Sequence, residues 1–388
     1  MNSKWEYRKI GDICIVERGS SPRPIEQYIT DSQDGINWIK IGDTTGSMYI
    51  TETAQKIKIE GMKKSRYVKP GDFLLSNSMS FGRPYILKID GCIHDGWLVL
   101  RDRDELFDKR FLYYYLSSKT TFQRFKSMAV GGVVNNLNSE MVRKVDVPVP
   151  PKNEQKEIAN LLDKLNNVVI LRQKELRKLD NLVKARFVEL FGDTVLNPFG
   201  WEKELLGTIC DVRDGTHDSP QYFNIGFPLV TSKNVTGGII DLTDCSLICE
   251  KDYNKINERS KVDIGDIIMP MIGTVGKPVI VDIEPNFAIK NVSLIKFKSD
   301  SKVLNIYIRA LLQSDYFDDA VLSKVRGGTQ KFISLGDIRK LEILVPPLEL
   351  QEQFAAFVEQ TDKSKAAVQK SLDKLQTLFD KLMQEYFG

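Results

Sequence analysis

Val145-Asp-Val-Pro-Val-Pro-Pro-Lys-Asn-Glu-Gln155 and Leu341-Glu-Ile-Leu-Val-Pro-Pro-Leu-Glu-Leu-Gln351 are two copies of one segment, 196 positions apart. In both copies a short apolar run reaches a Pro-Pro pair, and a long stretch without Gly or Pro follows. Proline is tolerated at a helix start because the first turn has no use for the missing N–H. The segment therefore predicts a strand that leads directly into a helix, twice in one chain.

The repeat extends over the whole sequence. Trp5-Glu6 recurs as Trp201-Glu202, and seven of the fifteen positions from 5 to 19 are identical in the second copy. Gly71-Asp72 recurs as Gly265-Asp266 at an offset of 194, and the offset then returns to 196 up to the final Phe-Gly. Self-similarity at one long period is the sign of a repeat architecture, and the chain is therefore a tandem duplication.

Each half begins with a globular region of about 150 residues, in which short apolar runs are broken by Gly, Pro and Asp. We expect an α+β fold: two pseudo-two-fold-related mixed α/β domains, separated by two long helices that form an antiparallel coiled coil. The predicted boundaries are 1–150 and 193–346 for the domains, and 151–192 and 347–388 for the helices. The predicted strands are Asp72–Ser76, Pro84–Ile89, Val145–Val149, Asp266–Pro270, Pro278–Ile283 and Leu341–Val345, and the predicted short helices are Asp108–Lys126 and Leu304–Lys324.

The long helices carry a narrow apolar stripe. In the first, Asn153 is a plausible N-cap, Glu154 and Glu157 suit the positive end of the helix dipole, and Gly192 is a natural stop. About 39 helical residues would span ~58 Å, too long for an ordinary core helix, so we expect the two helices to pair. The residues expected to pair are Leu165, Val168, Leu176, Leu179, Leu182, Val368, Leu372, Leu375 and Leu378.

Composition excludes several classes of protein. The chain has 388 residues, 42% of them hydrophobic, and a formal net charge of only +3, which argues against a polybasic protein but not against a local basic face. Five cysteines without a CxxC pair argue against a disulfide scaffold, and Cys245 and Cys249 have poor zinc spacing. No apolar run is long enough for a membrane helix. We expect a soluble cytoplasmic protein with no membrane partner.

Two divergent globular regions, each opening with Trp-Glu, closing at Pro-Pro…Gln and followed by a long helix, resemble the specificity subunit of type I restriction-modification systems. The resemblance covers the full chain and is most diagnostic in Val147–Asp163 and Leu344–Glu359. The second copy departs mildly, with Leu350 in place of Glu154 and Phe354 in place of Ile158.

The resemblance implies a function and a set of partners. In that family the globular regions are target-recognition domains for double-stranded DNA, and the helices bind two methyltransferase subunits. Restriction and translocase subunits join through the methyltransferase subunits. The chain would then be non-catalytic and hold no cofactor itself, because S-adenosylmethionine, ATP and Mg²⁺ would belong to its partners.

The duplication supports this interpretation by a separate route. If the helices pack antiparallel, one polypeptide imitates a DNA-binding dimer, whose half-sites lie about one helical turn, ~34 Å, apart. Since the halves differ in sequence, the target should be split and asymmetric, with a gap fixed by helix length. Three alternatives remain open: a rod that serves only dimerisation, the recognition subunit of a bipartite type II enzyme, and a coiled-coil assembly protein that binds no DNA.

Candidate DNA-contacting residues lie in loops near the repeated glycines, where Arg, Lys, Asn, Gln, Ser, Thr or His can reach base edges or phosphates. The glycines repeat while their polar neighbours differ, as in Ser21 against His217 and Asn135 against Lys331. In the first half the candidates are Arg18, Ser20, Arg23, Lys40, Asn77, Ser78, Arg83, His94, Asn135 and Asn136. In the second half they are Arg213, Thr216, His217, Lys233, Asn234, Thr274, Lys277, Lys290, Asn291, Arg326, Gln330 and Lys331.

Motifs for catalysis are weak. Asn197-Pro-Phe-Gly200 lacks the second proline of a methyltransferase motif, and Gly273–Lys277 has the wrong length and a following proline for a P-loop. Asp146 with Glu154-Gln-Lys156 loosely imitates a nuclease set, but the second copy lacks the Glu. His217-Asp218 has no evident nucleophile nearby, and Cys14 and Cys210 suit buried apolar positions. The sequence predicts no catalytic or metal site.

Overall fold

The computed structural model describes residues 5–77, 81–129, 136–271, 277–317 and 332–388, which form two compact units. Unit 1 is Met1–Gln173 with Lys370–Gly388, and unit 2 is Lys174–Gln369. The unit boundaries cut across both long helices, α6 (Lys152–Phe191) and α12 (Leu348–Phe387), whereas the predicted domain boundaries keep each helix whole.

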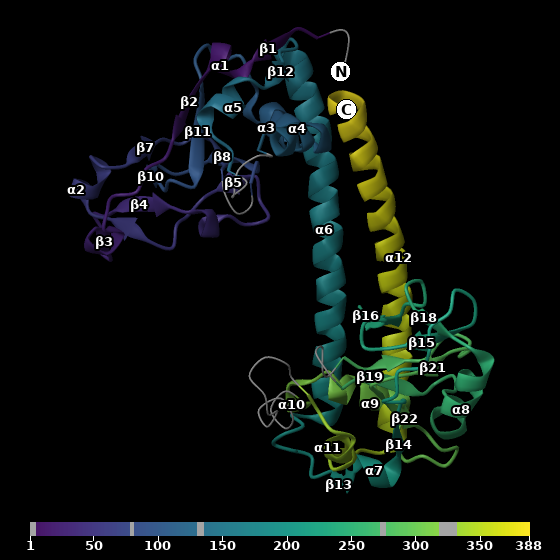
Figure 1. Ribbon diagram of the computed structural model, residues 1–388. Helices are drawn as coiled ribbons and strands as arrows, with labels where there is room; N and C mark the ends of the chain where they lie inside the picture. The colour runs from purple at the N-terminus through teal and green to yellow at the C-terminus, as the bar shows by residue number, and fades with distance from the viewer. Residues whose placement is uncertain (1–4, 78–80, 130–135, 272–276, 318–331) are drawn as a thin grey trace. The chain divides into compact units, whose positions relative to one another are not determined.

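Unit 1 is built on two mixed β-sheets and one pair of strands (Figure 1). The first sheet has the order β2 (Cys14–Arg18), β11 (Trp97–Asp102), β8 (Phe73–Ser76), β9 (Pro84–Leu87) and β5 (Tyr49–Ile50). The second has the order β3 (Ile29–Thr30), β6 (Lys56–Ile57), β4 (Ile36–Ile39), β10 (Gly91–Ile93) and β7 (Arg66–Val68), and β1 (Tyr7–Lys9) pairs with β12 (Asp146–Pro148). The helices are α1 (Ile10–Ile13), α2 (Ile59–Met62), α3 (Lys109–Ser117), α4 (Lys119–Ala129) and α5 (Ser139–Arg143), with 3₁₀ turns at Ile25–Gln27 and Ile41–Asp43.

Unit 2 repeats this plan with shorter sheets. One sheet has the order β14 (Asp211–Asp214), β22 (Val292–Lys296), β19 (Ile267–Pro270) and β20 (Val279–Ile280). The others are β18 (Ser246–Ile248), β15 (Phe227–Val230) and β21 (Ala288–Ile289), then β16 (Val235–Thr236) with β17 (Ile239–Ile240), and β13 (Glu202–Leu205) with β23 (Glu342–Val345). The helices are α7 (Leu206–Ile209), α8 (Glu250–Ser260), α9 (Asn305–Leu312), α10 (Asp315–Phe317) and α11 (Leu335–Arg339).

The predicted duplication is confirmed strand by strand. The order β2-β11-β8-β9 corresponds to β14-β22-β19-β20, and the parallel pair β4–β10 corresponds to β15–β21. In each half the first strand pairs antiparallel with the last, β1 with β12 and β13 with β23. This pairing closes each globular region, and the long helix starts directly after it. The expected mixed α/β fold with two repeated domains and long helices is therefore correct.

The far end of each long helix belongs to the core of the other half's domain. In unit 1 the Phe387 ring, near the end of α12, packs edge-on against Phe111 with ring centroids 5.4 Å apart. In unit 2 the Phe191 ring, at the end of α6, packs against Tyr307 at 4.8 Å. Buried aromatic rings of this size contribute strongly to stability, so each domain is completed by a helix that starts in the other copy.

Within unit 2 the two helices run antiparallel. Phe187 of α6 meets Phe354 of α12, with ring centroids 5.5 Å apart. About two turns further along α6 and three along α12, Asp180 Oδ1 accepts from Lys365 Nζ at 2.8 Å. The residue numbers fall along α6 as they rise along α12, which defines the antiparallel direction of this pair.

The buried stripe is narrower than predicted. Val368 is buried, and Leu165, Leu176, Leu179, Leu372 and Leu375 are half-buried. Val168, Leu182 and Leu378 are instead 37%, 49% and 44% exposed. Each of these three lies three residues from a half-buried leucine. Since a spacing of three residues is allowed within such a stripe, the exposure of these three side chains comes from their packing and not from their spacing.

The helix starts also differ in detail. Asn153 lies inside α6, which begins at Lys152, so it is not the N-cap. Gly192 is confirmed as the stop: its φ is 78° and its N–H donates to Val188 O at 2.8 Å. The predicted helix Asp108–Lys126 is two helices that meet at Ser118, whose extended backbone ends α3. Asp108 caps α3 by accepting from two backbone N–H groups.

A buried glutamine fastens each long helix to its domain. Gln155 Nε2 donates to Pro150 O at 2.8 Å and to Leu106 O at 3.0 Å, and its Oε1 accepts from Asp108 N–H at 2.8 Å. Gln351 makes the same three bonds in unit 2, to Pro346 O, Lys302 O and Leu304 N–H. Both side chains are fully buried. Because a buried backbone group without a partner is costly, the repeated glutamine fixes where the helix leaves the domain.

Candidate DNA interface

The loops predicted to contact DNA in unit 1 converge because of the strand register. β2 and β8 end at the same sheet edge at which β11 and β9 begin, since Leu98 pairs with Arg18 and Trp97 with Ser76. The parallel pair β4–β10 ends there too, and His94 N–H donates to Ile39 O at 3.1 Å. We call this place the strand-end edge of unit 1. It comprises Arg18–Arg23, Lys40, Asn77, Arg83, His94–Gly96 and Asn136. Asn136 belongs to it because the N–H of the next residue, Leu137, donates to Asn77 O.

One turn, His94–Gly96, organises this edge. Arg18 Nε and Asn77 Nδ2 both donate to the Asp95 carbonyl, at 3.0 and 2.9 Å. The Asp95 carboxylate accepts from Ser21 Oγ at 3.1 Å and lies 3.5 Å from Arg23 Nη2. Predicted residues from distant loops are thus joined through an aspartate that the sequence did not single out.

His94 has both ring nitrogens engaged inside the same turn. Its Nδ1 accepts from Gly96 N–H at 2.9 Å, so that nitrogen carries no proton. Its Nε2 lies 2.9 Å from Asp95 Oδ1 and must be the donor, because a carboxylate only accepts. The contacts therefore select the Nε2–H tautomer of His94.

The remaining candidates of unit 1 differ in how free they are. Asn77 is buried and acts within the scaffold. Ser20 Oγ donates to Lys64 O at 3.1 Å, and Lys40 Nζ donates to Gln55 Oε1 at 2.7 Å. Arg83, Arg23 and Asn136 have exposed side chains. These three are the side chains best able to reach a ligand.

Unit 2 presents the corresponding strand-end edge. β14 ends where β22 begins, since Asp214 pairs with Ser293, and Lys290 N–H donates to Val230 O at the end of β15. This strand-end edge of unit 2 contains the predicted residues Thr216, His217, Lys233, Asn234, Lys277, Lys290 and Asn291.

His217 is the centre of a polar network there. Its Nε2 lies 2.8 Å from Asp214 Oδ2, and its Nδ1 lies 2.9 Å from Asn291 Oδ1. Arg259 of α8 pairs with the other Asp214 oxygen. The hydrogen bond with Asn291 and then that with Asp214 raise the pKa of His217 above its ordinary value. The two histidines of the chain therefore lie at corresponding edges, although their sequence positions do not match.

The other candidates at this edge differ in burial and in their hydrogen-bond partners. Asn234 is buried, and its Oδ1 accepts from Thr231 N–H and Oγ1 at 3.0 and 2.9 Å, which makes it a turn residue. Lys290 Nζ donates to Ser219 Oγ at 2.6 Å. Lys233 and Lys277 are exposed.

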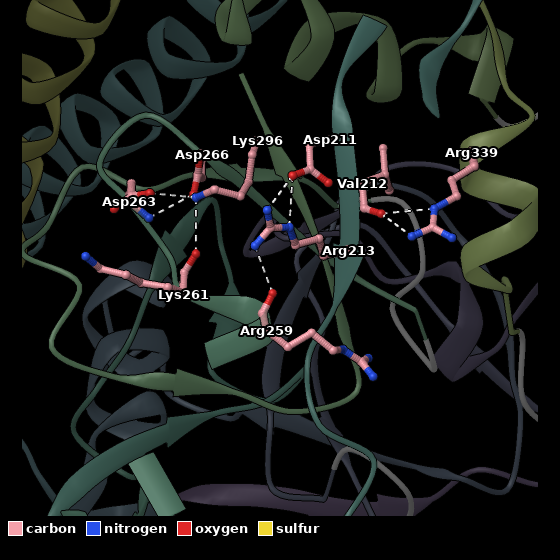
Figure 2. Close-up of polar contacts among 9 residues, drawn as sticks. All are labelled: Asp211, Val212, Arg213, Arg259, Lys261, Asp263, Asp266, Lys296 and Arg339. Atoms are coloured by element: carbon pink, nitrogen blue, oxygen red, sulfur yellow. Dashed lines mark hydrogen bonds and ion pairs between the residues drawn. The ribbon is translucent and has the colours of Figure 1, made fainter. Parts of the chain in front are cut away.

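Arg213 points into a different network, shown in Figure 2. Its Nε and Nη2 donate to Asp211 Oδ2 at 2.9 and 2.6 Å, and its Nη1 donates to Arg259 O at 2.9 Å. The bond from Arg213 lowers the pKa of Asp211. The charge of Arg213 is thus already compensated within the domain, whereas Lys233 and Lys277 form no ion pair with the described residues.

Some predicted residues lie outside the described part of the chain. They are Ser78, Asn135, Thr274, Arg326, Gln330 and Lys331. Most of the loop Gly273–Lys277 is likewise outside the described residues.

The sequence analysis missed the residues that support these edges. Arg143 Nη2 donates to Val16 O at 2.8 Å, and Arg339 Nη2 donates to Val212 O at 2.6 Å, the latter seen in Figure 2. Gly11 and Gly207 lie against these arginines, where a Cβ would come within 2.8 and 2.9 Å of the Arg Cβ. The signal was present, because both arginines and both glycines recur at the offset of 196.

The residues that the sequence analysis weighed for chemistry have structural contacts where they are described. The described residues hold no group of three or more His, Cys, Asp or Glu that could bind a metal. Glu154, from the nuclease-like set, accepts from Trp5 Nε1 at 3.0 Å and so serves packing. Burial raises the pKa of both Cys14 and Cys210 to about 12, which leaves these thiols unreactive. Among the described helices, none is both long and apolar enough to cross a membrane.

Comparison with known proteins decides the family. A model described as the type I restriction modification DNA specificity domain matches residues 2–181 and again 198–377. The chain belongs to this family. The two matched copies coincide with the two halves of the duplication, and this two-copy architecture supports the role of a DNA sequence-specificity subunit.

Relatives agree with this assignment over nearly their whole length. The type I restriction enzyme MjaIX specificity subunit of Methanocaldococcus jannaschii is 26% identical, across 98% of this chain and 91% of its own. The EcoKI specificity subunit of Escherichia coli is 20% identical, across 99% and 88%. The crystal structure of the S subunit of a type I system from M. genitalium has a TM-score of 0.58 at 17% identity, covering 100% of this chain and 97% of that one. It shares the fold.

Proposed function

We propose that this chain is the DNA-specificity subunit of a type I restriction-modification complex, in which each strand-end edge binds one half of a split, asymmetric target. The observation that carries the proposal is the convergence at each edge of Arg, Lys, Asn and His side chains from loops far apart in sequence. Phosphate contacts need the cations, and base readout needs the amides and imidazole. The side chains differ between the edges, which supports two different half-sites.

The long helices would set the gap and bind two methyltransferase subunits, through which the restriction subunits join. Exposed apolar side chains on α6 support a protein partner: Leu161, Val168 and Leu171 in unit 1, and Leu182 and Val188 in unit 2. S-adenosylmethionine, ATP and Mg²⁺ belong to the partners, and the chain itself performs no chemistry. The complex would act in the cytoplasm.

The edge is tested in the assembled complex with matched basic residues. Lys277→Ala and Arg83→Ala remove exposed cations from the two edges, whereas Lys298→Ala and Arg103→Ala remove exposed cations just beyond the opposite ends of β22 and β11. Loss of phosphate contacts should lower DNA affinity and reduce the slope of log K against log salt by about one unit per contact. The controls should change neither quantity, and equal effects of all four substitutions would contradict the proposal.

The helix role is tested by partner binding. Leu171→Asp should abolish co-purification of the methyltransferase subunit, because a charge on an apolar docking face is strongly unfavourable. Gln173→Asp, at a neighbouring exposed position of the same helix, should leave it intact. Retention of the partner by Leu171→Asp would show that this face is not the docking surface.

A further inference from the structure

One amide at the strand-end edge of unit 2 is held by a group that can gain or lose a proton. Asn291 follows β21 with a left-handed backbone, φ 56°, and its N–H donates to Thr216 O at 3.2 Å. Its Oδ1 lies 2.9 Å from His217 Nδ1. The backbone of Asn291 is therefore fixed from one side and its side chain from the other.

The contacts of His217 determine which nitrogen titrates. Its Nε2 faces Asp214 Oδ2 at 2.8 Å, and an ionised carboxylate only accepts, so Nε2 carries a proton in both charge states. Nδ1 is then the titrating atom. When Nδ1 is protonated, it donates to Asn291 Oδ1 and leaves the two Nδ2 hydrogens facing outward. When Nδ1 is bare, it accepts from Nδ2–H, and the amide turns so that Oδ1 faces outward.

We propose that His217 and Asn291 act as one specificity-determining pair, in which the proton on His217 selects whether Asn291 offers a donor or an acceptor to the DNA. The inference rests on the proposed function of this edge. With donors outward, the amide matches acceptors in the major groove, such as guanine O6 and N7. With the oxygen outward, it matches the amino groups of cytosine or adenine. The target of this pair is a base edge in the second half-site.

The charged groups around His217 favour the donor state on balance. Asp214 of β14 stabilises the imidazolium, Arg259 of α8 opposes it, and Lys290, beside Asn291, is bound to Ser219. Asp218 follows His217 in its own loop. The net result is a raised pKa, owed first to Asn291 and then to Asp214. The His217 side chain is 63% exposed, so DNA can reach the pair.

Unit 1 provides an internal control. The corresponding turn holds Asp95 in place of Asn291, and a carboxylate has no donor state to select at neutral pH. The Nδ1 of His94 is already occupied by Gly96 N–H. The unit 1 edge should therefore read its half-site with no dependence on the charge of its histidine.

The proton positions can be measured directly because the chain has only two histidines. In ¹⁵N-histidine-labelled full-length protein, ring-nitrogen shifts should show His217 as doubly protonated at pH 6 and as the Nε2–H tautomer once its proton is lost. His217→Gln assigns the signals. In uniformly ¹⁵N-labelled protein, the Asn291 side-chain NH₂ signal, assigned by its loss in Asn291→Asp, should move with the His217 titration and stay unchanged with pH in His217→Gln. The proposal would be overturned if neutral His217 carried its proton on Nδ1. It would also be overturned if the Asn291 NH₂ signal did not change as His217 titrates.

The readout is tested in the complex with its methyltransferase, using duplexes that vary one base pair at a time. Between pH 6 and pH 8.5, wild type should change its preference at one position of the second half-site by about tenfold, and at none in the first. Asn291→Asp should remove this pH dependence and favour a base that offers an amino group. A pH-independent second half-site, or a shift retained in Asn291→Asp, overturns the inference alone. A complex with no split target overturns the proposed function with it.

Discussion

The turns at the two strand-end edges, His94–Gly96 in unit 1 and Lys290–Asn291 in unit 2, occupy the same place in the fold and differ in chemistry. Each begins with a backbone bond to the neighbouring parallel strand, to Ile39 O and Val230 O. The first turn is organised by Asp95, whose carboxylate binds Ser21, Arg23 and His94 and whose carbonyl accepts from Arg18. The second is organised by the amide of Asn291, which is held by His217. The same backbone frame thus carries two different sets of donors and acceptors.

Away from the strand-end edges, the two units make the same contacts. Arg101 and Lys296 lie at equivalent strand positions, and each pairs with the aspartate of a Gly-Asp turn, at 3.1 Å to Asp72 and 2.5 Å to Asp266. Each also donates to a backbone carbonyl, that of Tyr67 or Lys261. The backbone frame is held by contacts that recur in both units, whereas the side chains at the strand-end edges differ. Two domains that recognise different DNA sequences on one scaffold require this arrangement.

The largest effect is expected from breaking the frame. Gln351→Ala leaves Leu304 N–H and the carbonyls of Lys302 and Pro346 without their buried partner. The expected loss is about 4 kcal/mol, at roughly 1–3 kcal/mol for each unsatisfied group. Urea unfolding followed by circular dichroism measures it, with Gln353→Ala, at an exposed position of the same helix, as the control. Equal urea midpoints for the two variants would show that the hydrogen bonds of Gln351 do not stabilise the domain.

A smaller loss is expected where the edge touches the frame. A Cβ on Gly19 would stand 2.2 Å from His94 O, so Gly19→Ala must displace the turn, at about 1–3 kcal/mol. Gly46 has open space around it, and Gly46→Ala should be neutral. Methylation mapping should show reduced recognition of the first half-site by Gly19→Ala only. An unaltered motif would mean that this turn does not position a reader.

Exchanging the chemistry of one turn sharpens the comparison. Asp95→Asn gives unit 1 the residue of unit 2 and removes the carboxylate that pairs with Arg23. Arg23 is mostly exposed, so the pair is worth at most ~1 kcal/mol, and DNA affinity should rise by about threefold as the cation is released. Filter binding at two salt concentrations measures this. Weaker binding would show that Asp95 itself contacts the DNA.

The smallest effect is a pH dependence of stability. The raised pKa of His217 means that its pairing stabilises the fold fully below pH 6.5 and is lost as the pH rises through the folded pKa. Because the side chain is well exposed, the contribution is a few tenths of a kcal/mol. The difference in urea midpoint between wild type and His217→Gln should shrink from pH 5.5 to pH 9. A difference that grows over this range would reverse the assigned sign.

Sequence reasoning reached the duplication, the long helices and the main strands, because these depend on local pattern and on self-comparison. It also reached the loops of the strand-end edges, since repeated glycines mark turns. It missed the helix break at Ser118, and it did not predict that Val168, Leu182 and Leu378 would be exposed, because burial within a stripe is decided by packing. Asp95 and Asp214 were missed because contacts from distant parts of the chain decide their roles: Ser21 and Arg23 for Asp95, and Arg259 of α8 for Asp214.

The proposed division of labour is tested most directly by exchange of one globular region. Residues 1–150 would be replaced by those of another family member, and adenine methylation would be mapped by long-read sequencing in cells with the native gene, the chimera or no gene. The account predicts one split motif that disappears without the gene and changes in one half only in the chimera. A motif that changes in both halves would contradict the account. So would an adenine-methylation pattern that is the same with and without the gene.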